Sequence, residues 1–199
     1  MLNKKNFYID GKWVSPIEPR NYKVIDPSNE EPCAEISLGG KKDVDKAVSA
    51  AKKAFETWAF TKKEERLELL EKLYVIYKKR WAEMAKLISL EMGAPIKFST
   101  EMQAATGAGH IKSFKQILKD FKFEKDLGEE KNNQKLLYEP KGVCALITPW
   151  NWPINQVNLK VIPALASACT VVLKPSEIAP LSSMLLAEMI DEAKFPSGV

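Results

Sequence analysis

The first forty positions contain short runs of aromatic, β-branched and alternating apolar residues, which predict short strands. The pair Asp10-Gly11 stands between aromatic and β-branched residues, which favours a type I′ hairpin turn. Two further strand-like runs span 22–27 and 34–38. We therefore expect an antiparallel sheet layer over residues 7–38, at an edge or an interface.

The pattern then changes to apolar positions spaced three and four residues apart, which predicts amphipathic helices over 43–121. Thr61 and Glu64 have the spacing of a capping box, so a helix should begin there. Gly107 and Gly109 weaken the last helix and permit close approach of another backbone. The expected helices are 43–59, 61–93 with a break near 79–81, and 96–121.

A charged segment over 122–135 predicts an exposed turn or hairpin tip, followed by a strand over 135–139. The run from Gly142 to Ile147 is apolar at consecutive positions, as in a strand that is covered on both faces of a parallel sheet. A helix over 155–168, kinked by Pro163 or beginning near it, a second buried strand over 170–173 and a helix over 181–193 are expected next. This β-α-β pattern indicates an α/β fold, namely the first part of a doubly wound parallel sheet with N-terminal antiparallel strands and flanking helices.

Composition and charge argue against several classes of function, among them nucleic-acid binding and membrane insertion. The chain has 199 residues, 45% hydrophobic and 28% charged, with a net charge of +4, which is typical of a globular protein. The lysines of 112–135 are mixed with acidic residues, so we expect a solvated face and no nucleic-acid partner. The polar N-terminus does not resemble a signal peptide, and no apolar run is long enough to span a bilayer. We expect no membrane partner and a cytoplasmic location.

The three cysteines, Cys33, Cys144 and Cys169, are widely spaced, and their number is odd. Neither a metal site nor a disulfide framework is expected from this spacing. Cys144 and Cys169 lie inside apolar runs, where a cysteine is usually a small core residue. The single histidine, His110, is expected to be structural.

Two segments carry candidate chemistry, 147–153 and 174–177. Both follow predicted parallel strands, and open α/β sheets bind ligands at the carboxyl ends of their strands. Asn151 could donate its amide to an oxyanion, although an asparagine in a proline-rich loop is usually a turn residue. Lys174 and Glu177 could bind a ribose, although such a pair is more often a surface ion pair. The glycine-rich dinucleotide fingerprint is absent after the first strand.

The order and spacing of the motifs PWNWP at 149–153 and TVVLKPSE at 170–177 closely resemble the NAD(P)-dependent aldehyde dehydrogenase superfamily. The resemblance extends over the whole chain, from the hairpin at 7–14 through EMGAP at 91–95 to FPSGV at 195–199. It implies the N-terminal portion of a Rossmann-like cofactor-binding domain. Within this portion it implies antiparallel strands over 7–38, a helical region over 43–121 and the first β-α-β units over 142–199, and it places the catalytic domain outside the chain.

The resemblance also implies roles for individual residues. Asn151 matches the family's oxyanion stabiliser, and Glu177 favours NAD over NADP because its charge would repel a 2′-phosphate. Lys160 matches a lysine that is associated with the catalytic region, or it is structural. The residues that match the family's cofactor contacts are Ile147, Thr148, Pro149, Trp150, Lys174, Ser176 and Glu177.

The cysteine nucleophile and the glutamate base of the family lie beyond position 199, and none of the three cysteines matches the nucleophile's motif. We therefore expect a fragment of an enzyme that oxidises an aldehyde to a carboxylic acid with NAD through a cysteine thioester. The fragment should be inactive alone, and its full-length parent should be a homodimer or homotetramer. The alternative is a non-catalytic module that binds nucleotide or assembles with a partner.

Overall fold

A computed structural model describes residues 1–127 and 134–199. The N-terminal region forms two small sheets rather than the single antiparallel layer expected. The predicted hairpin is confirmed as β2 (Phe7–Ile9) and β3 (Lys12–Val14), with positive φ at Asp10 and Gly11. A second sheet has the order β1-β5-β4, from β1 (Leu2–Lys4), β5 (Glu31–Ser37) and β4 (Asn21–Asp26). The strand β1, which was not predicted, pairs with β5 in parallel, whereas β4 pairs with it antiparallel.

The helical region follows the predicted pattern with shifted boundaries. The capping box is one residue later than expected, because the N–H of Lys62 donates to the Glu65 carboxylate at 3.1 Å. The predicted break is confirmed at Arg80, and the expected helix over 96–121 contains a π-helical turn. The helices are α1 (Lys41–Trp58), α2 (Lys63–Lys79), α3 (Trp81–Met92), α4 (Ile96–Phe98), the π-helical turn Ser99–Gln103 and α5 (Ala104–Asp120).

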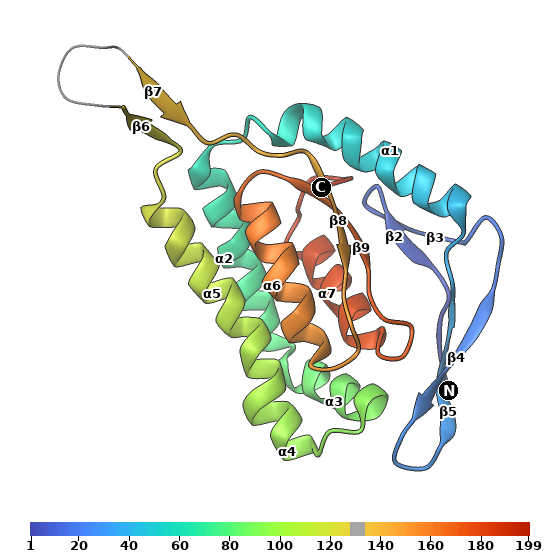
Figure 1. Cartoon of the computed structure of the whole chain (residues 1–199). Coiled ribbons are helices and arrows are strands. Elements are labelled where there is room, and N and C mark those ends of the chain that lie inside the picture. The colour runs from blue at the N-terminus through green and yellow to red at the C-terminus, as the bar shows by residue number, and fades with distance from the viewer. Residues whose placement is uncertain (128–133) are drawn as a thin grey trace.

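A hairpin projects from the end of α5, away from the body of the molecule (Figure 1). It consists of β6 (Glu124–Asp126) and β7 (Lys135–Leu137), whose residues are all exposed. The predicted exposed turn over 122–135 includes residues 128–133, which lie outside the described residues.

The C-terminal region confirms the β-α-β unit. Strand β8 (Val143–Ile147) pairs in parallel with β9 (Thr170–Lys174), and they are connected by α6 (Pro153–Ala166), which begins two residues earlier than expected and contains Pro163. Helix α7 (Leu181–Glu192) follows. The prediction that the first strand is covered on both faces is wrong here, because Ala145 and Ile147 are exposed.

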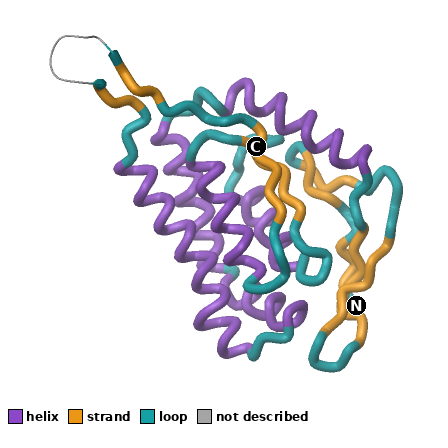
Figure 2. The backbone as a smooth tube through the Cα atoms, viewed as in Figure 1, coloured by secondary structure: helices purple, strands orange, loops and turns teal. Residues whose placement is uncertain are grey.

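Helices α2, α3, α5, α6 and α7 form one block, and β8 and β9 lie between it and the N-terminal strands, whereas α1 lies apart from the block and packs on β8 and β9 (Figure 2). The core consists of side chains from α2, α3, α5, α6 and α7, among them Leu73, Tyr77, Ile111, Ile154 and Leu165. Helix α1 is joined to the beginning of β9, since the Trp58 indole donates to the Cys169 carbonyl at 3.1 Å and the Thr170 hydroxyl donates to the Ala51 carbonyl at 3.0 Å. This core fixes where β8 and β9 end. Among the described helices, none is both long and apolar enough to cross a bilayer.

Candidate functional site

The carboxyl ends of β8 and β9 bring the two candidate segments together. Because the strands are parallel and in register, Ile147 lies opposite Lys174, and the loops that follow leave the same edge. The backbone N–H of Thr148 donates to the Lys174 carbonyl at 3.3 Å and so joins the two segments. The residues predicted from the sequence lie in these two segments, namely Ile147, Thr148, Pro149, Trp150, Asn151, Lys174, Ser176 and Glu177.

The loop after β8 is held in an unusual backbone conformation. Trp152 caps α6 with φ 54° and ψ 57°, a left-handed conformation that is uncommon for a bulky residue. Its ring packs edge-to-face on Phe98, with ring centroids 5.4 Å apart. Pro153 takes the first helical position, where its missing N–H costs nothing. These constraints fix where the chain leaves the loop and enters α6.

Asn151 is exposed at this point, two residues before α6 begins. Its side chain makes no hydrogen bond with another group in the part of the chain that the structure describes. The first turn of a helix also presents unpaired N–H groups and the positive end of the helix dipole. An anionic oxygen beside Asn151 would therefore meet a free amide donor and a favourable field.

Lys174 and Glu177 form an ion pair at the end of β9, with Nζ to Oε2 at 2.6 Å. The hydrogen bond from Lys174 lowers the pKa of the Glu177 carboxyl, so Glu177 is ionised at neutral pH. The side chains are 61% and 40% exposed, so both can also contact a ligand. An ammonium beside a carboxylate matches a vicinal diol, whose hydroxyls both donate and accept.

Two buried hydroxyls lie in the same segments. Ser176 is buried, and its Oγ accepts a hydrogen bond from the N–H of Ile178 at 3.2 Å, which leaves its own proton available. Thr148 is 4% exposed, and its Oγ1 makes no hydrogen bond within residues 1–127 and 134–199. Buried hydroxyls are normally paired, so the unpaired hydroxyl of Thr148 is an unusual feature of this loop. These donors suit the riboses and amide of a dinucleotide.

A polar pair that sequence reasoning missed lies near this loop. The Nε2 of His110, on α5, is 2.8 Å from the Oδ1 of Asn155, in the first turn of α6. Both residues are half-buried. The partner of His110 could not be recognised along the sequence, because it is 45 residues away. Lys160 is half-buried on the same helix.

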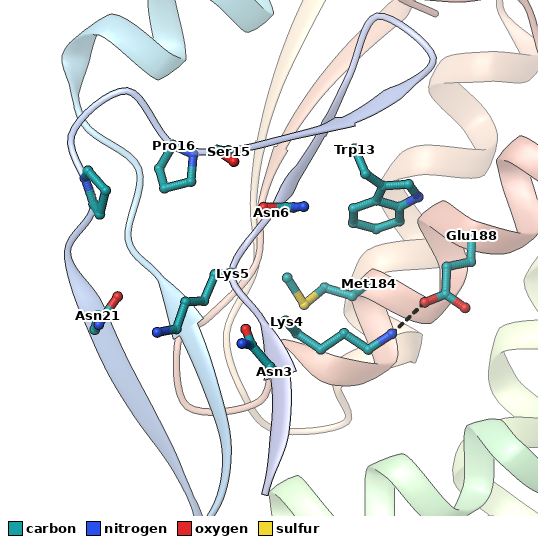
Figure 3. A pocket seen from close by; sticks show the side chains of 11 residues that line it. Asn3, Lys4, Lys5, Asn6, Trp13, Ser15, Pro16, Asn21, Met184 and Glu188 are labelled. Atoms are coloured by element: carbon teal, nitrogen blue, oxygen red, sulfur yellow. Dashed lines mark hydrogen bonds and ion pairs between the residues drawn. The ribbon is translucent and has the colours of Figure 1, made fainter.

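A separate cavity of about 770 Å³ lies between the N-terminal strands and α7 (Figure 3). None of the predicted site residues lines it. Its lysines are already paired, because Lys4 contacts Glu188 and Lys5 contacts Glu35, each at 2.7 Å. The charged groups of this cavity are therefore compensated internally, so the candidate site remains the edge formed by β8 and β9. Among the described residues, no group of His, Cys, Asp and Glu side chains is arranged to hold a metal ion.

Comparison with known proteins decides the family. The model of the aldehyde dehydrogenase family matches residues 13–199, which is nearly the whole chain. The chain belongs to the aldehyde dehydrogenase family. The resemblance seen in the sequence is thereby confirmed, and the Rossmann-like fold class agrees with the solved structures of this family.

Several relatives extend the comparison. The chain is 48% identical over its whole length to 3-succinoylsemialdehyde-pyridine dehydrogenase from a Pseudomonas species, and it covers 41% of that protein. An aldehyde dehydrogenase structure from Bartonella henselae is 58% identical, with a TM-score of 0.97, and 42% of that chain is covered. Aldehyde dehydrogenase C from Pseudomonas syringae, solved as a mutant with NAD+ and octanal, is 42% identical over 98% of this chain and 39% of its own, with a TM-score of 0.94. The chain thus spans about two fifths of the length of these relatives.

Proposed function

We propose that this chain provides the oxyanion-binding and cofactor-binding wall of an NAD-dependent aldehyde dehydrogenase, which oxidises a small-molecule aldehyde to a carboxylic acid. The observation that carries the proposal is the shared edge of β8 and β9, where Thr148 joins the loop of Asn151 to the turn of Lys174 and Glu177. Relatives solved with NAD+ support the choice of cofactor.

Asn151 has the first role in the proposed reaction. When a thiolate attacks the aldehyde carbon, the carbonyl oxygen becomes an oxyanion that needs hydrogen-bond donors. The amide of Asn151 is exposed, unpaired within the described residues and close to the beginning of α6. It can therefore hold the charge that develops at the oxygen while the thioester forms.

Lys174, Ser176 and Glu177 have the second role. The carboxylate of Glu177 would accept from ribose hydroxyls, Lys174 would donate to them, and Ser176 directly precedes Glu177 in the chain. Residues Ile147 to Trp150 would hold the other half of the cofactor. NAD, when bound, accepts a hydride from the substrate. Because Glu177 is ionised, a 2′-phosphate at this position would be repelled, which favours NAD over NADP.

The nucleophile of the reaction comes from outside this chain in our proposal. Cys144 is near the beginning of β8, Cys169 directly precedes β9, and Cys33 is in β5. None lies in the segments 147–153 or 174–177, which leave the opposite ends of β8 and β9. The chain alone should therefore not reduce NAD with any aldehyde. A homodimeric or homotetrameric parent and a cytoplasmic location stay predictions.

The role of Asn151 can be tested in a chimera that joins this chain to the remaining part of the Bartonella henselae relative. The 58% identity and the TM-score of 0.97 make the junction structurally compatible. Replacing Asn151 by alanine removes one oxyanion donor, so kcat for aldehyde oxidation should fall roughly 100- to 1,000-fold. NADH formation followed by absorbance measures the effect.

A matched variant controls for the loss of an amide elsewhere. Gln116 is an exposed amide on α5, and its side chain contacts Asp120 in the same helix. Gln116→Ala should leave kcat unchanged. Equal kcat values for Asn151→Ala and the unmodified chimera would overturn the assignment, as would NADH formation by the 199-residue chain alone.

A further inference from the structure

Two cysteines lie beside one another at the end of the β8–β9 pair that is remote from the candidate site. Cys144 is the second residue of β8, and its Cα pairs with that of Val171. Cys169 lies two residues before Val171 and directly precedes β9, so the two cysteines lie diagonally across this strand pair. Both are free thiols, and neither has a role in the proposed reaction.

Contacts with Gly142 and Ser167 surround the two sulfur atoms. The carbonyl oxygen of Gly142 accepts the N–H of Thr170 at 3.3 Å and lies 4.0 Å from the Sγ of Cys144. The Sγ of Cys169 lies 3.6 Å from the Oγ of Ser167. The thiols of Cys144 and Cys169 are close enough for each to shift the pKa of the other. The two thiols therefore share one small environment.

The surroundings distinguish the two thiols chemically. Burial alone would raise the pKa of Cys169, but hydrogen bonds from the Ser167 hydroxyl and from the backbone at Gly142 and Lys141 outweigh it, so the pKa lies below its usual value. Burial raises the pKa of Cys144. Such a pair consists of one thiol that ionises more readily and a neighbour that can react with its oxidised form.

We infer that Cys144 and Cys169 are a redox-active dithiol that closes to an intramolecular disulfide when the chain meets a peroxide. The Cys169 thiolate attacks one peroxide oxygen, the O–O bond breaks, and the sulfur becomes a sulfenic acid while one water leaves. The sulfur of Cys144 then attacks the sulfenic sulfur, forms the S–S bond and expels a second water. The two thiols lose two electrons and two protons, which the peroxide takes up.

The geometry sets one requirement for this step. Diagonal neighbours on adjacent strands lie farther apart than residues directly opposite each other, and a disulfide needs close Cα atoms. Cys169 follows Ala168, which has a positive φ of 62° and forms the turn that leads into β9. Formation of the disulfide therefore requires this turn to move toward Gly142. Cys169 itself is buried, so a small peroxide has to reach it past the partly exposed Cys144.

Peptide mapping of the folded chain tests the inference directly. Trypsin separates the three cysteines, because Cys33, Cys144 and Cys169 fall in the peptides 24–41, 142–160 and 161–194. After treatment with hydrogen peroxide, non-reduced digests should contain 142–160 linked to 161–194, lighter than the sum of the two peptides by two hydrogens. Free thiols should fall from three to one, and dithiothreitol should restore them.

Cys33 provides the matched control. It is half-buried, burial and the charge of Asp26 raise its pKa, and its thiol donates to the Val24 carbonyl at 3.4 Å. Cys33→Ser should keep the linked peptide, whereas Cys144→Ser should lose it and leave Cys169 as sulfinic or sulfonic acid. Separately oxidised or unmodified Cys144 and Cys169 in the wild-type chain would overturn the inference, as would links through Cys33. These readouts are independent of NAD and aldehyde.

Discussion

At the scale of single residues, Glu91 is the clearest case of a side chain whose role appears only in three dimensions. It lies on α3 and is 1% exposed, and its carboxylate accepts the backbone N–H groups of Leu181 and, at 3.0 Å, Ser182. It therefore caps α7 from another helix. The residues are about ninety positions apart, so no local sequence pattern could show this contact.

The same residue makes stability depend on pH. Burial raises the pKa of Glu91 to about 7, against the opposing hydrogen bonds from Ser182 and Leu181. The folded chain thus binds this proton more tightly than the unfolded chain, whose glutamates titrate near 4.3. The resulting stabilisation is fully present below that value and is lost as pH rises through about 7.

We expect urea unfolding to show this contribution between pH 5 and pH 8. Over this range the wild-type chain should lose up to roughly 3 kcal/mol more unfolding free energy than Glu91→Gln, which cannot titrate. Glu192→Gln, at an exposed position on α7, serves as the control and should behave as the wild type. Parallel pH profiles for the wild type and Glu91→Gln would contradict the assignment.

At the scale of elements, the spacing of apolar and polar residues predicted the helices and strands well. It did not predict the backbone conformation where one element joins the next. The Asp10-Gly11 hairpin and the break at Arg80 were predictable from turn chemistry and apolar spacing. The left-handed Trp152 was not, because its conformation depends on Pro153 and on packing against Phe98. The open face of β8 was also missed, since consecutive apolar residues do not tell which part of a fold covers them.

The packing of α5 shows how two similar glycines can differ. A Cβ on Gly107 would lie within 2.3 Å of the Tyr77 hydroxyl oxygen and 3.0 Å of Ile154, whereas one on Gly109 would meet nothing within 4 Å. Tyr77 cannot move freely, because its buried hydroxyl donates to the Ala104 carbonyl at 2.9 Å. The sequence predicted close approach at both positions, and the structure shows it at Gly107.

Alanine substitutions at these positions should therefore have opposite effects. Gly107→Ala should destabilise the chain by about 1–3 kcal/mol through overpacking. Gly109→Ala should stabilise it by up to about 1 kcal/mol, because it adds only helix propensity. Chemical denaturation of both variants measures the difference, and a stabilised Gly107→Ala would show that α5 is not held against Tyr77 as described.

At the scale of the whole molecule, the fold class and the two candidate segments could be predicted because family motifs lie directly on them. The pairing between the segments could not, since the bond from Thr148 to Lys174 depends on the register of β8 and β9. The position of the second cavity, beside Trp13 and Glu188, could not be predicted from the sequence either, because residues near both ends of the chain line it. These two places offer competing locations for a ligand.

Titration of the isotope-labelled chain with NAD, followed by amide chemical shifts, distinguishes these two locations most directly. We expect weak binding, with shifted amide signals confined to segments 147–153 and 174–177. These shifts should be lost in Glu177→Gln but not in Glu192→Gln. NADP should cause smaller shifts in the wild-type chain. Shifts gathered around Trp13 and Glu188, or no shifts at millimolar NAD, would contradict the proposal that the edge of β8 and β9 is the cofactor-binding wall.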